Sequence, residues 1–151
     1  MNIVILTPVP SNVFVPPLKL GYPRVFSSVS PFHPCREVNI NASRAQLQEY
    51  YRKNLVGQYD FVLLMDSDVV IDDVGVELMK MEWSEGKTPC CNTKGVPASK
   101  TGHVVTSCAL LSRDDYIGVD FMKNPYECQC LKLPHPFYVE SVVGHEIKCK
   151  I

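Results

Sequence analysis

The feature that most constrains this chain is an apolar run over residues 59–65 that ends in two carboxylates, Asp66 and Asp68. A run of this length, with aromatic and branched side chains, is typical of a strand buried on both faces, as in a parallel sheet. The carboxylates then lie at the carboxyl edge of the strand, where open α/β sheets bind ligands. Two acidic groups so close repel each other unless a cation offsets their charge, so the pattern predicts a metal site. A simpler interpretation is a turn that caps the following helix.

Strand-like and helix-like segments alternate along the rest of the chain, and a proline-studded loop occupies residues 8–34. This alternation predicts an α/β fold with a mainly parallel sheet in a single domain over residues 1–151. We expect strands at 2–6, 37–40, 59–65, 88–92 and 137–143, an apolar segment at 103–111, and helices from Asn41 or Ser43 to about Leu55, at 74–84 and at 113–118.

Composition excludes several classes of function. The chain has 151 residues, 46% of them hydrophobic, and a formal net charge of −1, which suits a domain with a substantial core. No basic run indicates a nucleic-acid partner, and no apolar stretch approaches the roughly 20 residues of a membrane span. Residues 1–8 predict a first strand and not a signal peptide. We therefore expect a cytoplasmic protein, in the host cytoplasm if the source is a virus.

Seven cysteines are many for such a protein, and an odd number cannot all pair within one chain. Their spacing predicts no zinc site, because Cys90 and Cys91 are adjacent and Cys128 and Cys130 are closer than a usual ligand pair. We expect free or buried thiols, with internal disulfides only if the source is a hyperthermophile.

Five short motifs, taken in order, carry a resemblance to a known family. The motifs are Leu6–Val9, Asn41–Arg44, Leu64–Asp68, Ala109–Arg113 and Tyr138–His145. With these motifs the chain resembles small glycosyltransferases of the GT-A fold over nearly its whole length, in particular the short forms of bacteriophages and other viruses. The resemblance implies a Rossmann-like domain with hexosyltransferase activity, which transfers a sugar from a nucleotide-sugar donor such as a UDP- or GDP-sugar.

The family resemblance implies a divalent cation, Mn²⁺ or Mg²⁺, that bridges the diphosphate of the donor. Hard oxygen ligands suit these ions, and the metal offsets charge that develops on the leaving nucleoside diphosphate. By this resemblance Asp68 is a direct metal ligand, and Asp66 faces the ribose or reaches the metal through water. His145 completes the set of ligands, although a lone histidine after a strand is otherwise more often structural.

Two further parts of the donor site follow from the same resemblance. Arg44, near the start of a helix, contacts the nucleotide or its phosphates, for which its charge is suited. Thr7, Pro8 and Val9 form the wall of the base-binding site, because they follow the first strand at the same edge. The simpler interpretations are a solvated surface arginine and an ordinary exit from a strand.

The catalytic base departs from the family pattern. Larger relatives carry an acidic pair between Arg113 and Phe137, whereas this chain has Glu127 in that region. We rank Glu127 first, since a general base must reach the acceptor hydroxyl. Three alternatives stay open: a retaining enzyme that needs no such base, a role for Asp114 and Asp115, and a chain without activity.

Two other functions fit the same residues. The run from Asp66 to Val70 also resembles the opening motif of haloacid-dehalogenase-type phosphatases, in which the first aspartate is a nucleophile. That motif normally lies on the first strand, whereas here about 60 residues precede it. The other alternative is a protein that binds a nucleotide or sugar without turnover. The sequence does not identify the acceptor. A partner subunit, such as a second copy of the chain in a homo-oligomer, is one source of the residues that form the acceptor subsite.

Overall fold

The computed structural model describes residues 1–9, 15, 17–27, 33–67, 69–84, 87–93, 108–124 and 136–144. Within these residues six strands form one sheet in the order β2-β1-β3-β5-β4-β6, which confirms the α/β class. The strands are β1 (Ile3–Thr7), β2 (Arg24–Phe26), β3 (Phe61–Met65), β4 (Thr88–Thr93), β5 (Cys108–Ser112) and β6 (Pro136–Gly144). The helices are α1 (Arg36–Tyr50), which continues into a π-helical turn η1 (Tyr51–Leu55), α2 (Asp73–Ser84) and α3 (Arg113–Ile117).

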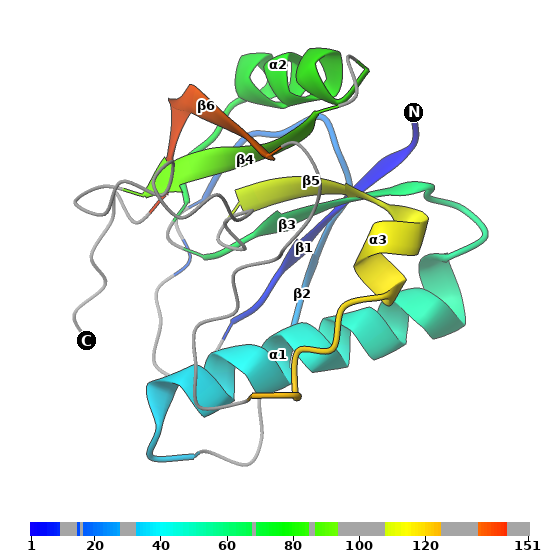
Figure 1. The fold of residues 1–151 in the computed structure, drawn as a ribbon, viewed down its shortest axis with the longest axis vertical. Coiled ribbons are helices and arrows are strands. Elements are labelled where there is room, and N and C mark those ends of the chain that lie inside the picture. Colours follow the sequence, from blue (N-terminus) through cyan, green and yellow to red (C-terminus); the bar gives the residue numbers. More distant parts are fainter. Residues whose placement is uncertain are drawn as a thin grey trace.

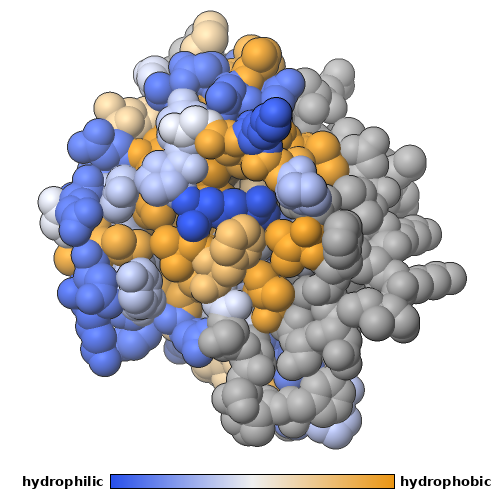
Figure 2. Space-filling view, turned by 180° about the vertical axis from the view of Figure 1, so that it is seen from behind, coloured by the Kyte–Doolittle hydropathy of each residue, from blue (hydrophilic) through white to orange (hydrophobic). Residues whose placement is uncertain are grey.

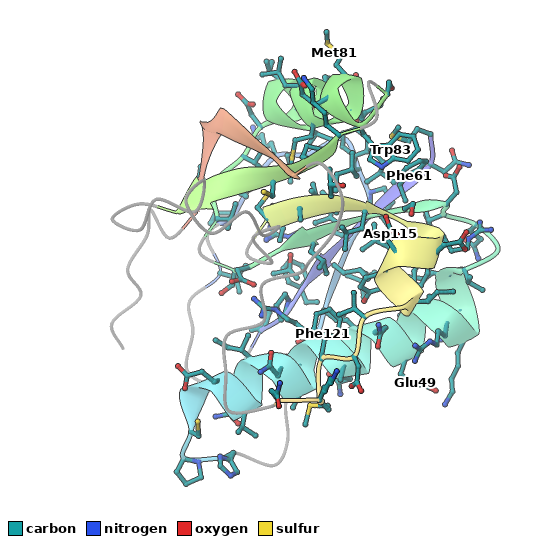
Figure 3. All side chains as sticks on the ribbon, in the orientation of Figure 1. Glu49, Phe61, Met81, Trp83, Asp115 and Phe121 are labelled. Atoms are coloured by element: carbon teal, nitrogen blue, oxygen red, sulfur yellow. The ribbon has the colours of Figure 1, made fainter. Side chains whose placement is uncertain are left out.

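Helices cover both faces of the sheet, with α2 on one face and α1 and α3 on the other (Figure 1). On the first face, the ring of Trp83 from α2 lies edge-on to that of Phe61, with 4.5 Å between centroids (Figure 3). On the second face, Tyr51 and Tyr116 make a similar contact at 5.2 Å. Since both faces are covered, the central strands are apolar throughout and do not alternate with polar residues.

The two central parallel strands, β1 and β3, confirm the expected strands at 2–6 and 59–65. All five residues of each strand are buried, and the pairing places Ile3 beside Phe61 and Leu6 beside Leu64. The expected helices at 74–84 and 113–118 and the strands at 88–92 and 137–143 are also confirmed, within one or two residues at each end.

The sheet is mainly parallel, as expected, with one antiparallel strand. Three strand pairings are parallel, but β5 is antiparallel to both of its neighbours, β3 and β4. An apolar run indicates burial on both faces but does not fix the direction of the strand. As a result, β1, β2, β3, β4 and β6 all end at one edge of the sheet, and β5 starts there with Cys108 opposite Met65.

Two local expectations are wrong. Residues 37–40 are not a strand but the first turn of α1, where the Asn39 side chain both donates to the carbonyl and accepts from the N–H of His33. This polar clasp fixes the helix start five residues before Asn41. The proline-studded loop contains the three-residue strand β2, which pairs with β1 directly after Pro23. Tertiary pairing outweighs local propensity in both segments.

Candidate functional site

The carboxyl edge of the sheet brings together the ends of strands that lie far apart in the sequence. Since β1 and β3 are parallel and Leu6 pairs with Leu64, Thr7 lies level with Met65, and Asp66 follows directly. At the other side of the sheet, Gly144 of β6 pairs with Thr93 of β4 at the same edge. Ligands of open α/β sheets bind outside such carboxyl ends, so the topology places Thr7 and Asp66 where a site is expected.

The strongest polar contact at this edge is an ion pair between Arg44 and Asp66. The Nη2 atom of Arg44 lies 2.9 Å from Oδ1 and 3.2 Å from Oδ2 of Asp66. The side chains are 5% and 14% exposed, so water screens the pair little. Arg44 reaches the edge from α1, where its residue is buried against the sheet. The contact places Arg44 beside Asp66, whereas its predicted contact with the nucleotide or its phosphates stays a prediction.

This pairing gives Arg44 a role that the sequence did not indicate. Its guanidinium neutralises and orients a carboxylate of the protein, whereas the family resemblance placed it on the nucleotide or its phosphates. A carboxylate whose two oxygens both accept from one arginine has little basicity left for a nucleophilic role. The two roles predicted for Asp66, contact with a ribose hydroxyl and contact with the metal through water, stay predictions.

The segment after β1 is tied to the end of β2. Thr7 is fully buried, Pro8 is buried and Val9 is partly exposed. The N–H of Val9 donates to Oγ of Ser27 at 2.8 Å, and the N–H of Ser27 donates to the carbonyl of Thr7 at 3.2 Å. These bonds fix residues 7–9 as a wall at the edge, as predicted, although contact of this wall with a base stays a prediction.

A second arginine at this edge was missed by the sequence analysis. Arg24 of β2 donates from Nε to Oγ1 of Thr7 at 2.9 Å, and its guanidinium lies 4.7 Å from the centroid of the Phe26 ring. Burial lowers the pKa of the Arg24 guanidinium. The alternation of charged, apolar and aromatic residues at 24–26 was the available signal for a strand, but the prolines around it indicated a loop.

Three predicted site residues, Asp68, Glu127 and His145, lie outside the described residues, and their roles stay predictions. Over the described part of the chain, no three His, Cys, Asp or Glu side chains gather into a metal-binding group. The hard oxygens of Asp66 suit Mn²⁺ or Mg²⁺, but with both of them on Arg44 they suit contact through a water better than direct ligation.

The topology excludes Asp114 and Asp115 as the alternative catalytic base. Both residues lie in α3, which starts after Ser112 at the end of β5, and Ser112 pairs with Phe61 at the start of β3. Because β5 is antiparallel, α3 begins at the edge opposite the carboxyl ends, where Figure 3 shows Asp115. The hydroxyl of Ser112 accepts from the N–H of Asp115 at 3.3 Å, so this pair serves the helix start.

No protein-family model matches the chain, and no curated protein matches it. Among solved structures, the crystal structure of A197 from STIV is similar, with a TM-score of 0.52 and 13% sequence identity. The match covers 94% of this chain and 83% of that chain. At such low identity the likeness shows the fold and carries no chemistry. Within the described residues, no helix combines the length and the apolar character that crossing a membrane requires.

Proposed function

We propose that the chain is a metal-dependent glycosyltransferase of the GT-A type, which moves a sugar from a nucleotide-sugar donor to an acceptor. The observation that carries this proposal is the buried Arg44–Asp66 pair at the carboxyl edge of the sheet. Charged side chains are seldom buried unless they are paired, and such groups gather at functional sites. Here the pair lies where a donor nucleotide is expected to bind.

The proposal assigns a role to each residue of the site. The wall formed by residues 7–9 is held by Ser27 and stands beside the donor. Arg44 holds Asp66 in one orientation, so that its oxygens meet a ribose hydroxyl or a bound water without rearrangement. A divalent cation held by Asp68 and His145, with Asp66 in support, would offset the charge of the departing diphosphate. Glu127 remains the proposed base.

The phosphatase alternative is less consistent with the same contact. In that mechanism the first aspartate must attack a phosphorus atom with a free oxygen. The guanidinium of Arg44 holds both oxygens of Asp66 and lowers their nucleophilicity. The ion pair therefore favours a positioned acceptor of hydrogen bonds over a nucleophile at this position.

Donor hydrolysis tests the proposal without knowledge of the acceptor. A panel of UDP- and GDP-sugars is incubated with the protein, and release of the nucleoside diphosphate is measured with and without Mn²⁺. We expect Mn²⁺-stimulated release for at least one donor, and a loss of about tenfold or more in Asp66→Asn. Asp120→Asn is the matched control, since Asp120 is exposed and lies beyond α3. A panel without any stimulated release contradicts the proposal.

A further inference from the structure

Two arginines reach the carboxyl edge from opposite faces of the sheet. The register pairs Ile3 with Phe61, Ile5 with Arg24 and Thr7 with Phe26, and alternate residues of a strand share a face. Since Phe61 packs against Trp83 of α2, Arg24 and Phe26 lie on the α2 face. Arg44 belongs to α1 on the other face. A ligand that sits over the edge therefore has one arginine on each side.

Among the described residues, none supplies a negative charge to Arg24. None of the ion pairs between described residues involves Arg24, and its Nε bond to the neutral Thr7 is the one hydrogen bond that the described residues provide. Its Nη2 atom is buried and has no hydrogen-bond partner there. Of the five N–H donors of the guanidinium, therefore, the one on Nε has an acceptor among the described residues.

The contact with Phe26 does not replace that acceptor. A cation over an aromatic face gains about 0.5–1 kcal/mol at an exposed site, but a ring face gives no oxygen to the N–H groups. Phe26 is also 48% exposed, an uncommon state for a large aromatic side chain. The face of the molecule opposite to that of Figure 1 shows hydrophilic residues between apolar areas (Figure 2). The arginine is held in place by Thr7 and Phe26, yet no described residue neutralises its charge.

We propose that Arg24 is the anion-binding residue of this edge and that it takes phosphate oxygens of the nucleoside diphosphate. The inference rests on the proposed function for the identity of the anion. The charge of Arg44 is already neutralised by Asp66 at 2.9 Å, so Arg24 is, among the described arginines of this edge, the one without a carboxylate partner for its charge. Guanidinium donors match the tetrahedral oxygens of a phosphate group, and the bonds are charge-assisted. Thr7 is a positioning residue, because its hydroxyl fixes Nε and so the direction of the other donors.

Binding of three probes tests this assignment: a nucleoside diphosphate, inorganic pyrophosphate and the nucleoside without phosphates. The variants are Arg24→Gln, Arg24→Lys and the matched control Lys53→Gln, which removes one positive charge from an exposed position on η1. We expect Arg24→Gln to weaken the binding of the nucleoside diphosphate and of pyrophosphate by about 10–100-fold, the effect of losing a charge-assisted hydrogen bond. Arg24→Lys should lie between, because it keeps the charge but loses the planar fork. The nucleoside and the control should be unaffected.

The outcomes separate this inference from the proposed function. Unchanged pyrophosphate affinity in Arg24→Gln overturns the inference. So does an equal loss of affinity for the nucleoside and for the nucleoside diphosphate, since that result places Arg24 on the base or ribose. Nucleotide binding that is equal in wild type and Arg24→Gln leaves the proposed function intact. Pyrophosphate binding that needs Arg24 in a protein that binds no nucleotide supports the anion site and contradicts the proposed function. Thermal melting of each variant confirms that the fold is kept.

Discussion

Arg44 and Arg24 lie at the same edge of one sheet, but they differ in what neutralises them. Arg44 comes from α1, is 4% exposed as a residue and holds a carboxylate of its own chain. Arg24 comes from the edge strand β2, is half-buried and holds a neutral hydroxyl and an aromatic ring. The difference teaches that an arginine near a predicted site is available to a ligand only if the protein has not already supplied its counter-charge.

The largest expected effect comes from breaking the paired arginine. Asp66→Ala leaves the Arg44 charge buried and unpaired, which typically costs about 3–5 kcal/mol. For a chain of this size we expect the melting temperature to fall by about 6–20 °C. Adding Arg44→Met to Asp66→Ala should restore most of the loss, because both charges are then removed.

The comparison fails if Asp66→Ala has the melting temperature of wild type. It also fails if Arg24→Met destabilises the protein as much as Asp66→Ala does, because no described carboxylate pairs with Arg24. Differential scanning calorimetry measures the melting temperatures of these variants. Wild type, Asp66→Ala, Arg44→Met and the double variant form a double-mutant cycle, which gives the coupling free energy between Arg44 and Asp66.

A smaller effect is expected at a buried polar group that lies far from the edge. The hydroxyl of Tyr116 on α3 has no hydrogen-bond partner among the described residues, and burial, followed by the nearby Tyr51, raises the pKa of this tyrosine. Tyr116→Phe removes the desolvated hydroxyl and keeps the edge contact with Tyr51. We expect a gain of about 1 kcal/mol, or about 2–4 °C in melting temperature.

This variant sharpens the comparison, since an unpartnered group inside the core differs from one at a ligand-binding edge. Tyr116→Phe should leave nucleotide binding unchanged while Arg24→Gln weakens it. A fall in the melting temperature of Tyr116→Phe would indicate instead that the hydroxyl has a stabilising partner.

The smallest effect concerns the segment that leads into β2. The Tyr22 hydroxyl donates to the Glu77 carboxylate on α2, and Asp73 accepts from the N–H of Gly21 at 3.0 Å. The Tyr22 bond, and then Lys80, lowers the pKa of Glu77, and the Glu77 bond, followed by burial, raises the pKa of Tyr22. The stabilisation is therefore present at neutral pH. It is lost as the pH falls through the lowered pKa of Glu77 or rises through the raised pKa of Tyr22.

Tyr22→Phe should reduce the loss of stability at acidic pH and the loss at alkaline pH. The measurement is the melting temperature of the variant and of wild type across this pH range. Arg24 follows this segment by two residues, so the same variant tests whether the segment positions the arginine. An unchanged pH profile of stability would show that the Tyr22–Glu77 contact does not contribute in solution.

The parts of the fold that the sequence predicted correctly are those with a strong local signal. The apolar run before Asp66 is buried on both faces, and helix α2 follows it as its spacing of apolar residues indicated. The position of Asp66 at the carboxyl edge followed from this run, whereas its contact with Arg44 was not predicted.

The parts that could not be predicted depend on pairing between distant segments. Strand β2 has three residues between prolines and exists because Ile5 and Thr7 of β1 bond to its neighbours. The direction of β5 decides that Asp114 and Asp115 face the wrong edge, but its sequence is equally apolar in either direction. Arg24 was overlooked for the same reason, since its role depends on a strand that local propensity does not indicate.

The most direct test of the account is the metal dependence of nucleotide binding, measured by titration calorimetry with UDP and GDP in the presence and absence of Mn²⁺. The account predicts Mn²⁺-dependent binding that is abolished in Asp68→Asn with an unchanged melting temperature. It also predicts that binding is kept in Asp72→Asn, the same substitution at an exposed aspartate that caps the N–H of Gly75. Equal affinity with and without Mn²⁺, or wild-type affinity in Asp68→Asn, would contradict it.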